Sequence, residues 1–333
     1  MKGNVRAMKQ IATFPKAAAA LVSTIFLTVS LGAGALAASP PPQPTVYTGG
    51  VTSLTPTSVI LLGGLNAKAQ PANYRFQYGT TGAYGTQTPL QPGGRSPAEI
   101  HVNQPVGGLT PNTLYHYRLV AFGARGAVIG GDHTFKTPKV PLALSIAASP
   151  TPVPFGDTFV LGGTLFGTGH AARAITLQAN PFPYVQGFKT LGNPELTNAT
   201  GAFSFPIVGM AVNTQFRVVT TSAPFVVSPV FLESVAVRVN FQVQRVHRHK
   251  PGRYYRMYGT VAPAEVGAEV GFQLIRPGHS SVNVGGTTVH AGSATVSTFS
   301  TVVRIRHRGV YEALVKIADG AHVSAYSEPV RIG

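Results

Sequence analysis

The chain has 333 residues, of which 44% are hydrophobic and only 11% are charged, and its formal net charge is +16. It contains no cysteine, which excludes disulfide frameworks, thiolate nucleophiles and lipid attachment through cysteine. Residues 235–333 carry twelve Lys and Arg against five Asp and Glu, so a polyanionic partner is to be sought there.

Residues 1–38 have the pattern of a targeting segment. A basic start is followed by an apolar run over residues 17–38, with an Ala-Leu-Ala cleavage pattern at 35–37. This predicts a signal peptide, with an uncleaved signal anchor as the alternative, and then a Pro-rich linker over 39–44. The expected location is therefore secreted or at the cell surface, with contact to a membrane only if the leader stays in place.

Short alternating segments and turn residues predict a first β-sandwich over residues 45–138. We expect its strands at 58–62, 73–78, 99–106, 114–122 and 131–137. Leu109, Pro111 and Tyr115 stand where a tyrosine corner would place them, with the tyrosine hydroxyl bonding back to the upstream backbone. The sequences Tyr74–Thr80, Leu109–Tyr115 and Thr134–Thr137 resemble those of bacterial fibronectin type III domains. This fold often has a tryptophan on an early strand, and since the chain has no Trp we expect an aliphatic residue such as Ile60 in its place.

The remainder of the chain contains one pattern twice, over residues 139–234 and 235–333. Thr164 and Ser228 of the first copy correspond to Thr260 and Ser327 of the second, and the strand-like segments between them keep their order. The two copies resemble the Ig-like repeats of bacterial surface proteins. The expected fold class is therefore all-β: tandem antiparallel β-sandwiches of fibronectin type III and Ig-like type, preceded by a signal helix.

Motifs that could carry catalysis or cofactor chemistry lack the required context. Residues 167–172 match a dinucleotide fingerprint, but a strand follows instead of a helix, so a hairpin loop is the better interpretation. Residues 278–282 begin like a nucleophile elbow and end in Val where Gly is needed. His247 and His249 would share one face of a strand without an identifiable third metal ligand. Glu265 and Glu269 flank a turn, where solvated charges are ordinary. We expect no catalytic residues, no cofactor and no metal.

Two basic clusters in the last repeat are the best functional signal. We expect the first cluster, residues 245–258, to form a hairpin end around Pro251 and Gly252. We expect the second cluster, residues 304–308, to continue a strand in which Val303 and Ile305 face the core, while Arg304, Arg306 and Arg308 face outward. If they share a face, they present a positive stripe with interleaved tyrosines that could bind phosphate, sulfate or uronate groups. The opposing interpretation is that these residues serve only solubility and edge-strand protection. The candidate contacts are Arg245, Arg248, Lys250, Arg253, Arg256, Arg304, Arg306 and Arg308.

These observations favour a non-enzymatic, exported structural or adhesive protein that acts as an extracellular interaction and spacer module. One alternative is a protein that binds cell-wall polymer or anionic polysaccharide through its basic last domain. Another is a noncatalytic accessory subunit of a secreted polysaccharide hydrolase. A protein partner at the cell surface fits the first reading, and nucleic acid is disfavoured for an exported chain.

Overall fold

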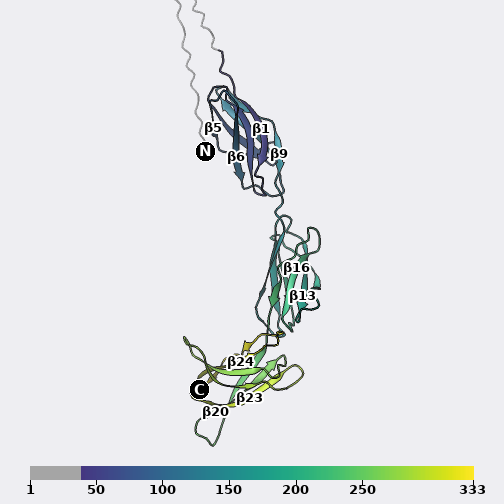
Figure 1. Ribbon diagram of the computed structural model, residues 1–333, viewed down its shortest axis with the longest axis vertical. Helices are drawn as coiled ribbons and strands as arrows, with labels where there is room; N and C mark the ends of the chain where they lie inside the picture. Colours follow the sequence, from purple (N-terminus) through teal and green to yellow (C-terminus); the bar gives the residue numbers. More distant parts are fainter. Residues whose placement is uncertain (1–38) are drawn as a thin grey trace, which may run out of the picture. The chain divides into compact units, whose positions relative to one another are not determined.

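The computed structural model describes residues 39–333, so the predicted signal helix lies outside the described residues. Within this range every regular element is a β-strand, and there is no helix long and apolar enough to cross a membrane. The strands form three hydrophobic cores, and each core lies between two sheets. The chain thus forms tandem antiparallel β-sandwiches, which confirms the predicted fold class. Figure 1 labels strands of each sandwich.

The first sandwich places a three-stranded sheet, β1-β2-β6, against a sheet with the central order β4-β3-β7-β8, to which β5 and β9 add. On β2 the side chains of Val59 and Leu61 enter the core, while Ile60 is half-buried on the other face, so the prediction that Ile60 fills the tryptophan position was wrong. The strands are β1 (Thr45–Thr52), β2 (Ser58–Asn66), β3 (Ala72–Gly79), β4 (Thr86–Gln87), β5 (Gln91–Gly94), β6 (Ile100–Gly107), β7 (Leu114–Gly123), β8 (Gly126–Ile129) and β9 (His133–Lys136).

The second sandwich places sheet β10-β12-β15 against sheet β14-β13-β16-β17. Residues 167–173 link β12 of one sheet to β13 of the other, so they form an arch between sheets and not the predicted hairpin loop. The strands are β10 (Ala143–Ser149), β11 (Val153–Pro154), β12 (Phe159–Phe166), β13 (Ala174–Pro181), β14 (Lys189–Leu196), β15 (Ala202–Ile207), β16 (Thr214–Thr220), β17 (Phe231–Glu233) and β18 (Val235–Ala236).

The third sandwich places sheet β19-β20-β23 against sheet β22-β21-β24-β25, with β26 also pairing with β24. Its core contains the fully buried rings of Phe272 and Tyr311. Val235 belongs to the second core and Val237 to the third, so the chain passes from one to the next within three residues. The strands are β19 (Arg238–Val246), β20 (Arg253–Ala262), β21 (Glu269–Ile275), β22 (Val282–Thr288), β23 (Ser297–Ile305), β24 (Gly309–Lys316), β25 (Ala325–Tyr326) and β26 (Val330–Ile332).

The second and third sandwiches share the order of their main strands: β10-β12-β15 matches β19-β20-β23, and β14-β13-β16 matches β22-β21-β24. They also share a buried serine: the N–H of Val218 donates to Ser228 Oγ at 2.9 Å, and the N–H of Ala313 donates to Ser327 Oγ at 3.0 Å. Each hydroxyl in turn donates to the carbonyl of the residue that follows it. The repeated landmark in the sequence therefore marks one recurring contact, in which a side chain accepts from a buried backbone N–H that would otherwise be unpaired.

Backbone hydrogen bonds join the second sandwich to the third. The N–H of Asn213 donates to the carbonyl of Ala321 at 2.7 Å, and the N–H of Val323 donates to the carbonyl of Val235 at 2.8 Å. The Asn213 amide also donates to the Gly320 carbonyl at 2.9 Å. The loops of the second sandwich that lie at this junction are 155–158, 182–188 and 208–213.

Candidate basic binding surface

Three loops of the third sandwich come together at the end of its strands that lies away from the junction. They are 247–252, between β19 and β20; 276–281, between β21 and β22; and 306–308, between β23 and β24. The register fixes this meeting, since Tyr254 pairs with Arg304 and Ile275 pairs with Val310. We call this surface the basic pole and define it by Arg245, His247, Arg248, His249, Lys250, Arg253, Arg276, His279, Arg304, Arg306, His307, Arg308 and Arg331.

The hairpin 247–252 lies against the second basic cluster. Gly252 has φ of 133°, and a Cβ there would lie 2.7 Å from Nε of Arg304, so glycine is what allows the close approach. The guanidinium of Arg248 lies 5.7 Å from the centre of the Tyr254 ring, within cation–π range. Arg253 Nη2 donates to the carbonyl of Arg306 at 3.4 Å. The two clusters recognised in the sequence therefore share one surface.

Two further contacts hold the other loops in place. The fully buried Tyr311 donates its hydroxyl proton to the carbonyl of His307 at 2.6 Å, which ties the loop 306–308 to the core. Burial raises the pKa of the Tyr311 hydroxyl, while the nearby charge of Arg253 lowers it. Arg276 donates from Nε and Nη2 to the carbonyl of Ser280 at 3.2 and 2.9 Å. Hydrogen bonds therefore anchor the loops 306–308 and 276–281.

The pole is unneutralised. Nine of the twelve Lys and Arg side chains of residues 235–333 belong to it, and none of them takes part in an ion pair formed by the described residues. Two clefts open between its loops. A cleft of about 750 Å³ has Ile275 and Val310 in its wall and a cationic rim of Arg276, Arg308 and Arg331. A second cleft of about 500 Å³ is lined by residues including Arg304, Arg306 and Tyr311.

The structure divides the predicted contact residues among four settings. Arg245, Arg248, Lys250 and Arg253 lie on the hairpin end, and Arg304 is the penultimate residue of strand β23. Arg306 and Arg308 lie in the loop after that strand, so the predicted strand alternation does not extend to them. Arg256 lies further along β20 on the solvent face. His247 and His249 lie in the hairpin loop, so the idea that they share a strand face was wrong.

Arg276, Arg331 and His279 were missed at the sequence level. Arg276 and His279 follow strand β21 and Arg331 lies on β26, far along the chain from both clusters. The pairing of Val310 with Ile275 on one side and with Arg331 on the other brings them into the pole. The available signal was that several basic residues of this repeat follow the end of a predicted strand.

The tyrosine-corner residues lie in the first sandwich. The N–H of Thr110 donates to the Tyr115 hydroxyl at 2.9 Å, and the Tyr115 ring stacks on Phe135 with centres 5.5 Å apart. Leu109 is buried in the same core, and Pro111 accepts at its carbonyl from the Thr113 hydroxyl. These residues therefore contribute to the core and its turn and not to a binding surface.

A second cluster of titratable groups lies at the junction between the second and third sandwiches. His322 Nδ1 lies 2.9 Å from Glu265 Oε1 and 2.9 Å from Asp319 Oδ2, and Nε2 lies 2.8 Å from the carbonyl of Ala211. Burial raises the pKa of Glu265, aided by the charge of Asp319 and opposed by His322. Burial also acts to raise the pKa of Asp319, but hydrogen bonds from the backbone and ring of His322 bring it below its usual value.

These three side chains are of metal-ligating type and lie close enough to hold an ion. The separations of 2.9 Å are those of hydrogen bonds, with both carboxylates facing Nδ1 and a backbone carbonyl of the second sandwich facing Nε2. The contacts of the ring therefore come from both sandwiches. Its structural role is to join the two sandwiches.

No protein-family model and no curated protein matches the chain. Among solved structures, a tetra-tandem repeat from the extending region of a large adhesion protein is 13% identical, with a TM-score of 0.27 over 87% of this chain and 74% of that one. The FN1–FN3 domains of chicken CNTN1 are 14% identical, with a TM-score of 0.26 over 88% and 97%.

Trypsin-activated α-2-macroglobulin from Escherichia coli is 13% identical, with a TM-score of 0.25 over 86% of this chain and 23% of that one. This chain thus spans about a quarter of that protein's length. Identities and TM-scores this low say nothing of ligand, partner or activity, and the assignment of the fold rests on the strand pairing described above.

Proposed function

We propose that this chain is a non-enzymatic, exported interaction module that binds anionic polymers through the basic pole of its third sandwich. The observation that carries the proposal is the convergence of nine Lys and Arg side chains from three loops, the adjoining ends of β19, β20 and β23, and strand β26, none of them in an ion pair formed by the described residues. Guanidinium groups bind carboxylate, sulfate and phosphate in two-point contacts, so arginine is the suitable residue for such a polymer.

The junction between the second and third sandwiches supports a role in display. The two hydrogen bonds of Asn213, the bond from the N–H of Val323 to the carbonyl of Val235 and the ring of His322 all cross it. A sandwich held to its neighbour by backbone pairing presents its loops in a fixed direction, which suits a spacer that carries an adhesive surface.

The test is retention of the chain on immobilised heparin across a salt series. We expect strong retention that falls steeply with salt, because binding releases counterions from the polymer. Replacement of Arg248, Arg304 and Arg306 by Gln is expected to lower the slope of log K against log salt by roughly two, by analogy with about 0.7–0.9 per charge on nucleic acid.

A matched control removes the same charge elsewhere. Arg95, Arg125 and Lys139 are exposed and lie in or next to the first sandwich, so their replacement by Gln changes net charge equally. If the control triple weakens retention as much as the pole triple, net charge and not the pole is responsible, and the proposal fails. Elution of the unmodified chain at low salt would also reject it, leaving solubility as the role of the basic residues.

A further inference from the structure

The solvent face of sheet β19-β20-β23 carries a mainly polar surface, interrupted by the half-buried Val302 beside Arg256, that continues toward the basic pole. Strand alternation sends Phe241, Met257 and Phe299 into the core, and the residues between them face outward. Cross-strand partners bring these residues into rows, with Gln242 beside Tyr258 and Tyr258 beside Ser300. We call this surface the outer platform and define it by Asn240, Gln242, Arg256, Tyr258, Thr260, Thr298 and Ser300.

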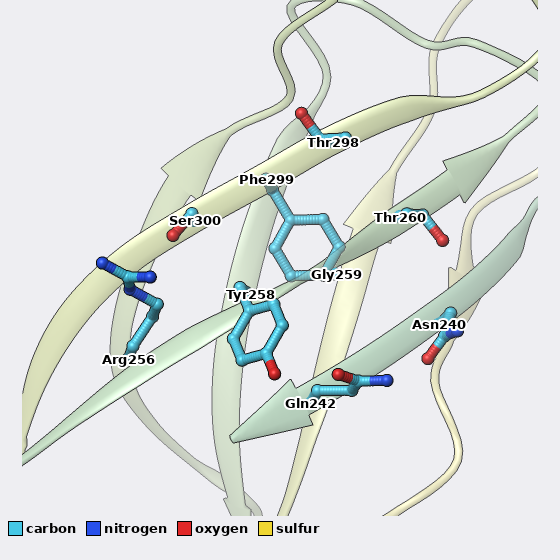
Figure 2. A pocket seen from close by; sticks show the side chains of 9 residues that line it. All are labelled: Asn240, Gln242, Arg256, Tyr258, Gly259, Thr260, Thr298, Phe299 and Ser300. Carbon is cyan, nitrogen blue, oxygen red and sulfur yellow. The ribbon is translucent and has the colours of Figure 1, made fainter. Parts of the chain in front are cut away.

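Figure 2 shows the platform with its amides on β19, its guanidinium and phenol on β20, and two of its hydroxyls on β23. These side chains surround a shallow hollow of about 290 Å³. Within residues 39–333, none of the seven side chains makes a hydrogen bond to another protein group: those formed by the third sandwich involve other residues. Their donors and acceptors are therefore available to a ligand.

The chemistry of the platform matches a chain of sugars. Amide and hydroxyl groups both donate and accept, as the neighbouring hydroxyls of a sugar ring require. The half-buried Tyr258 supplies an aromatic surface with a polar tip. The platform has no carboxylate, whereas the solvent face of the opposite sheet pairs Glu269 with Lys316 at 3.4 Å. An acidic chain meets no repelling charge on the platform, and Arg256 adds an attractive one.

The platform and the pole are continuous along strand β20. Tyr254, beside Arg304, lies on the same face as Arg256 and Tyr258, because these positions are separated by even numbers of residues. At about 3.3 Å per residue, Tyr254 and Tyr258 are roughly 13 Å apart, with the Arg256 guanidinium between them. A ligand that uses both surfaces must be extended and must carry hydroxyl groups as well as anionic groups.

We propose that the outer platform is a glycan subsite, and that the third sandwich binds an acidic polysaccharide lying along β20, with its sugar rings on the platform and its anionic groups reaching the pole. This inference rests on the proposed polyanion-binding function and narrows its ligand class from any polyanion to an acidic glycan.

The experiment compares two probes of high negative charge, a size-defined heparin oligosaccharide and inorganic polyphosphate, which has no sugar. The platform variant combines Tyr258→Leu with Gln242→Ala, and Gln242→Ala alone serves if the double variant fails to fold. The control is Gln273→Ala on the opposite sheet, where Gln273 faces Glu312. Circular dichroism and thermal unfolding establish that each variant is folded.

We expect the platform variant to bind the heparin oligosaccharide about tenfold more weakly, the equivalent of about 1.4 kcal/mol, while polyphosphate binding stays unchanged. The pole triple should lose affinity for both probes. Unchanged heparin affinity in the platform variants, or an equal loss for both probes, would overturn the glycan subsite and leave the proposed function in place. Failure of the unmodified chain to bind either probe would overturn both. Loss of heparin binding in the platform variants with no loss in the pole triple would overturn the pole alone.

Discussion

Replacement of Glu233 by Gln is expected to stabilise the protein at neutral pH. Glu233 lies on β17 with its side chain fully buried, and neither carboxylate oxygen has a hydrogen-bond partner among the described residues. Burial raises the pKa of this carboxyl, and the nearby Thr151 hydroxyl and N–H groups of Val153 and Ser234, which do not reach hydrogen-bond geometry with it, oppose the rise only in part. An uncompensated buried charged group costs about 1–3 kcal/mol or more, and the neutral amide avoids the part that comes from charge.

The sign of the pH dependence follows from the raised pKa. The folded state binds the proton more tightly than the unfolded chain, so the free energy of unfolding increases as the pH falls through the raised value toward the ordinary 4.5. The slope from this one group reaches at most about 1.4 kcal/mol per pH unit. Glu233→Gln lacks this dependence, so its advantage over the unmodified protein is largest at pH 7 and shrinks on acidification.

Differential scanning calorimetry of the full chain between pH 7 and pH 4.5 measures this effect in the transition that includes the second sandwich. A gain of about 1 kcal/mol raises the Tm of a domain of this size by roughly 4–8 °C. Glu195→Gln, at an exposed position of the same sandwich, is the matched control and is expected to change little. A variant at Glu233 that is less stable than the unmodified protein at both pH values would refute the reasoning, since it would mean that the carboxylate is compensated.

Three further substitutions test the contacts that hold the sandwiches. His322→Leu removes the hydrogen-bond partner of the mostly buried Glu265, so the free energy of unfolding of the third sandwich should fall by about 1–3 kcal/mol, and adding Glu265→Gln should recover part of the loss in calorimetry. Tyr115→Phe removes the hydroxyl that accepts from the N–H of Thr110, and water can take over only part of this contact. The free energy of unfolding measured in urea should therefore fall by about 0.5–1.5 kcal/mol, and no change would mean that water is an equally good acceptor. Ser327→Ala leaves a buried N–H of β24 without an acceptor, so the free energy of unfolding should fall by about 1–3 kcal/mol in the same assay. An unchanged free energy of unfolding would contradict the recurring serine contact.

The strands could be read from the sequence because alternation is local. In segments such as 73–78 and 114–122, apolar and polar residues alternate over enough positions to indicate which face is buried. The structure pairs these two segments as β3 and β7. The direction of a continuous apolar run is not local. In the run 58–62 every residue after Ser58 is apolar. The pattern therefore does not indicate whether Ile60 or its neighbours Val59 and Leu61 enter the core.

The composition of the pole was only half predictable for a similar reason. A hairpin such as 247–252 is signalled by its own Pro and Gly, so its basic residues could be assigned to one place. Arg276 and Arg331 join it through the pairing of β21 with β24 and of β24 with β26, which depends on the register between distant strands. The strand alternation expected for Arg306 and Arg308 ended where β23 ends, at Ile305.

A comparison of the second and third sandwiches indicates that the charge of the pole is not required for folding. In the second sandwich the equivalent loops are 155–158, 182–188 and 208–213, and they contain no Lys or Arg. Those loops serve the junction, where Ala211 and Asn213 bond to the third sandwich. One strand order is thus compatible with loops that have no Lys or Arg and contact a neighbouring sandwich, and with basic loops that leave their charges unpaired. Substitution of the basic residues should therefore preserve the fold, which makes loss of binding in the pole triple a direct measure of the surface.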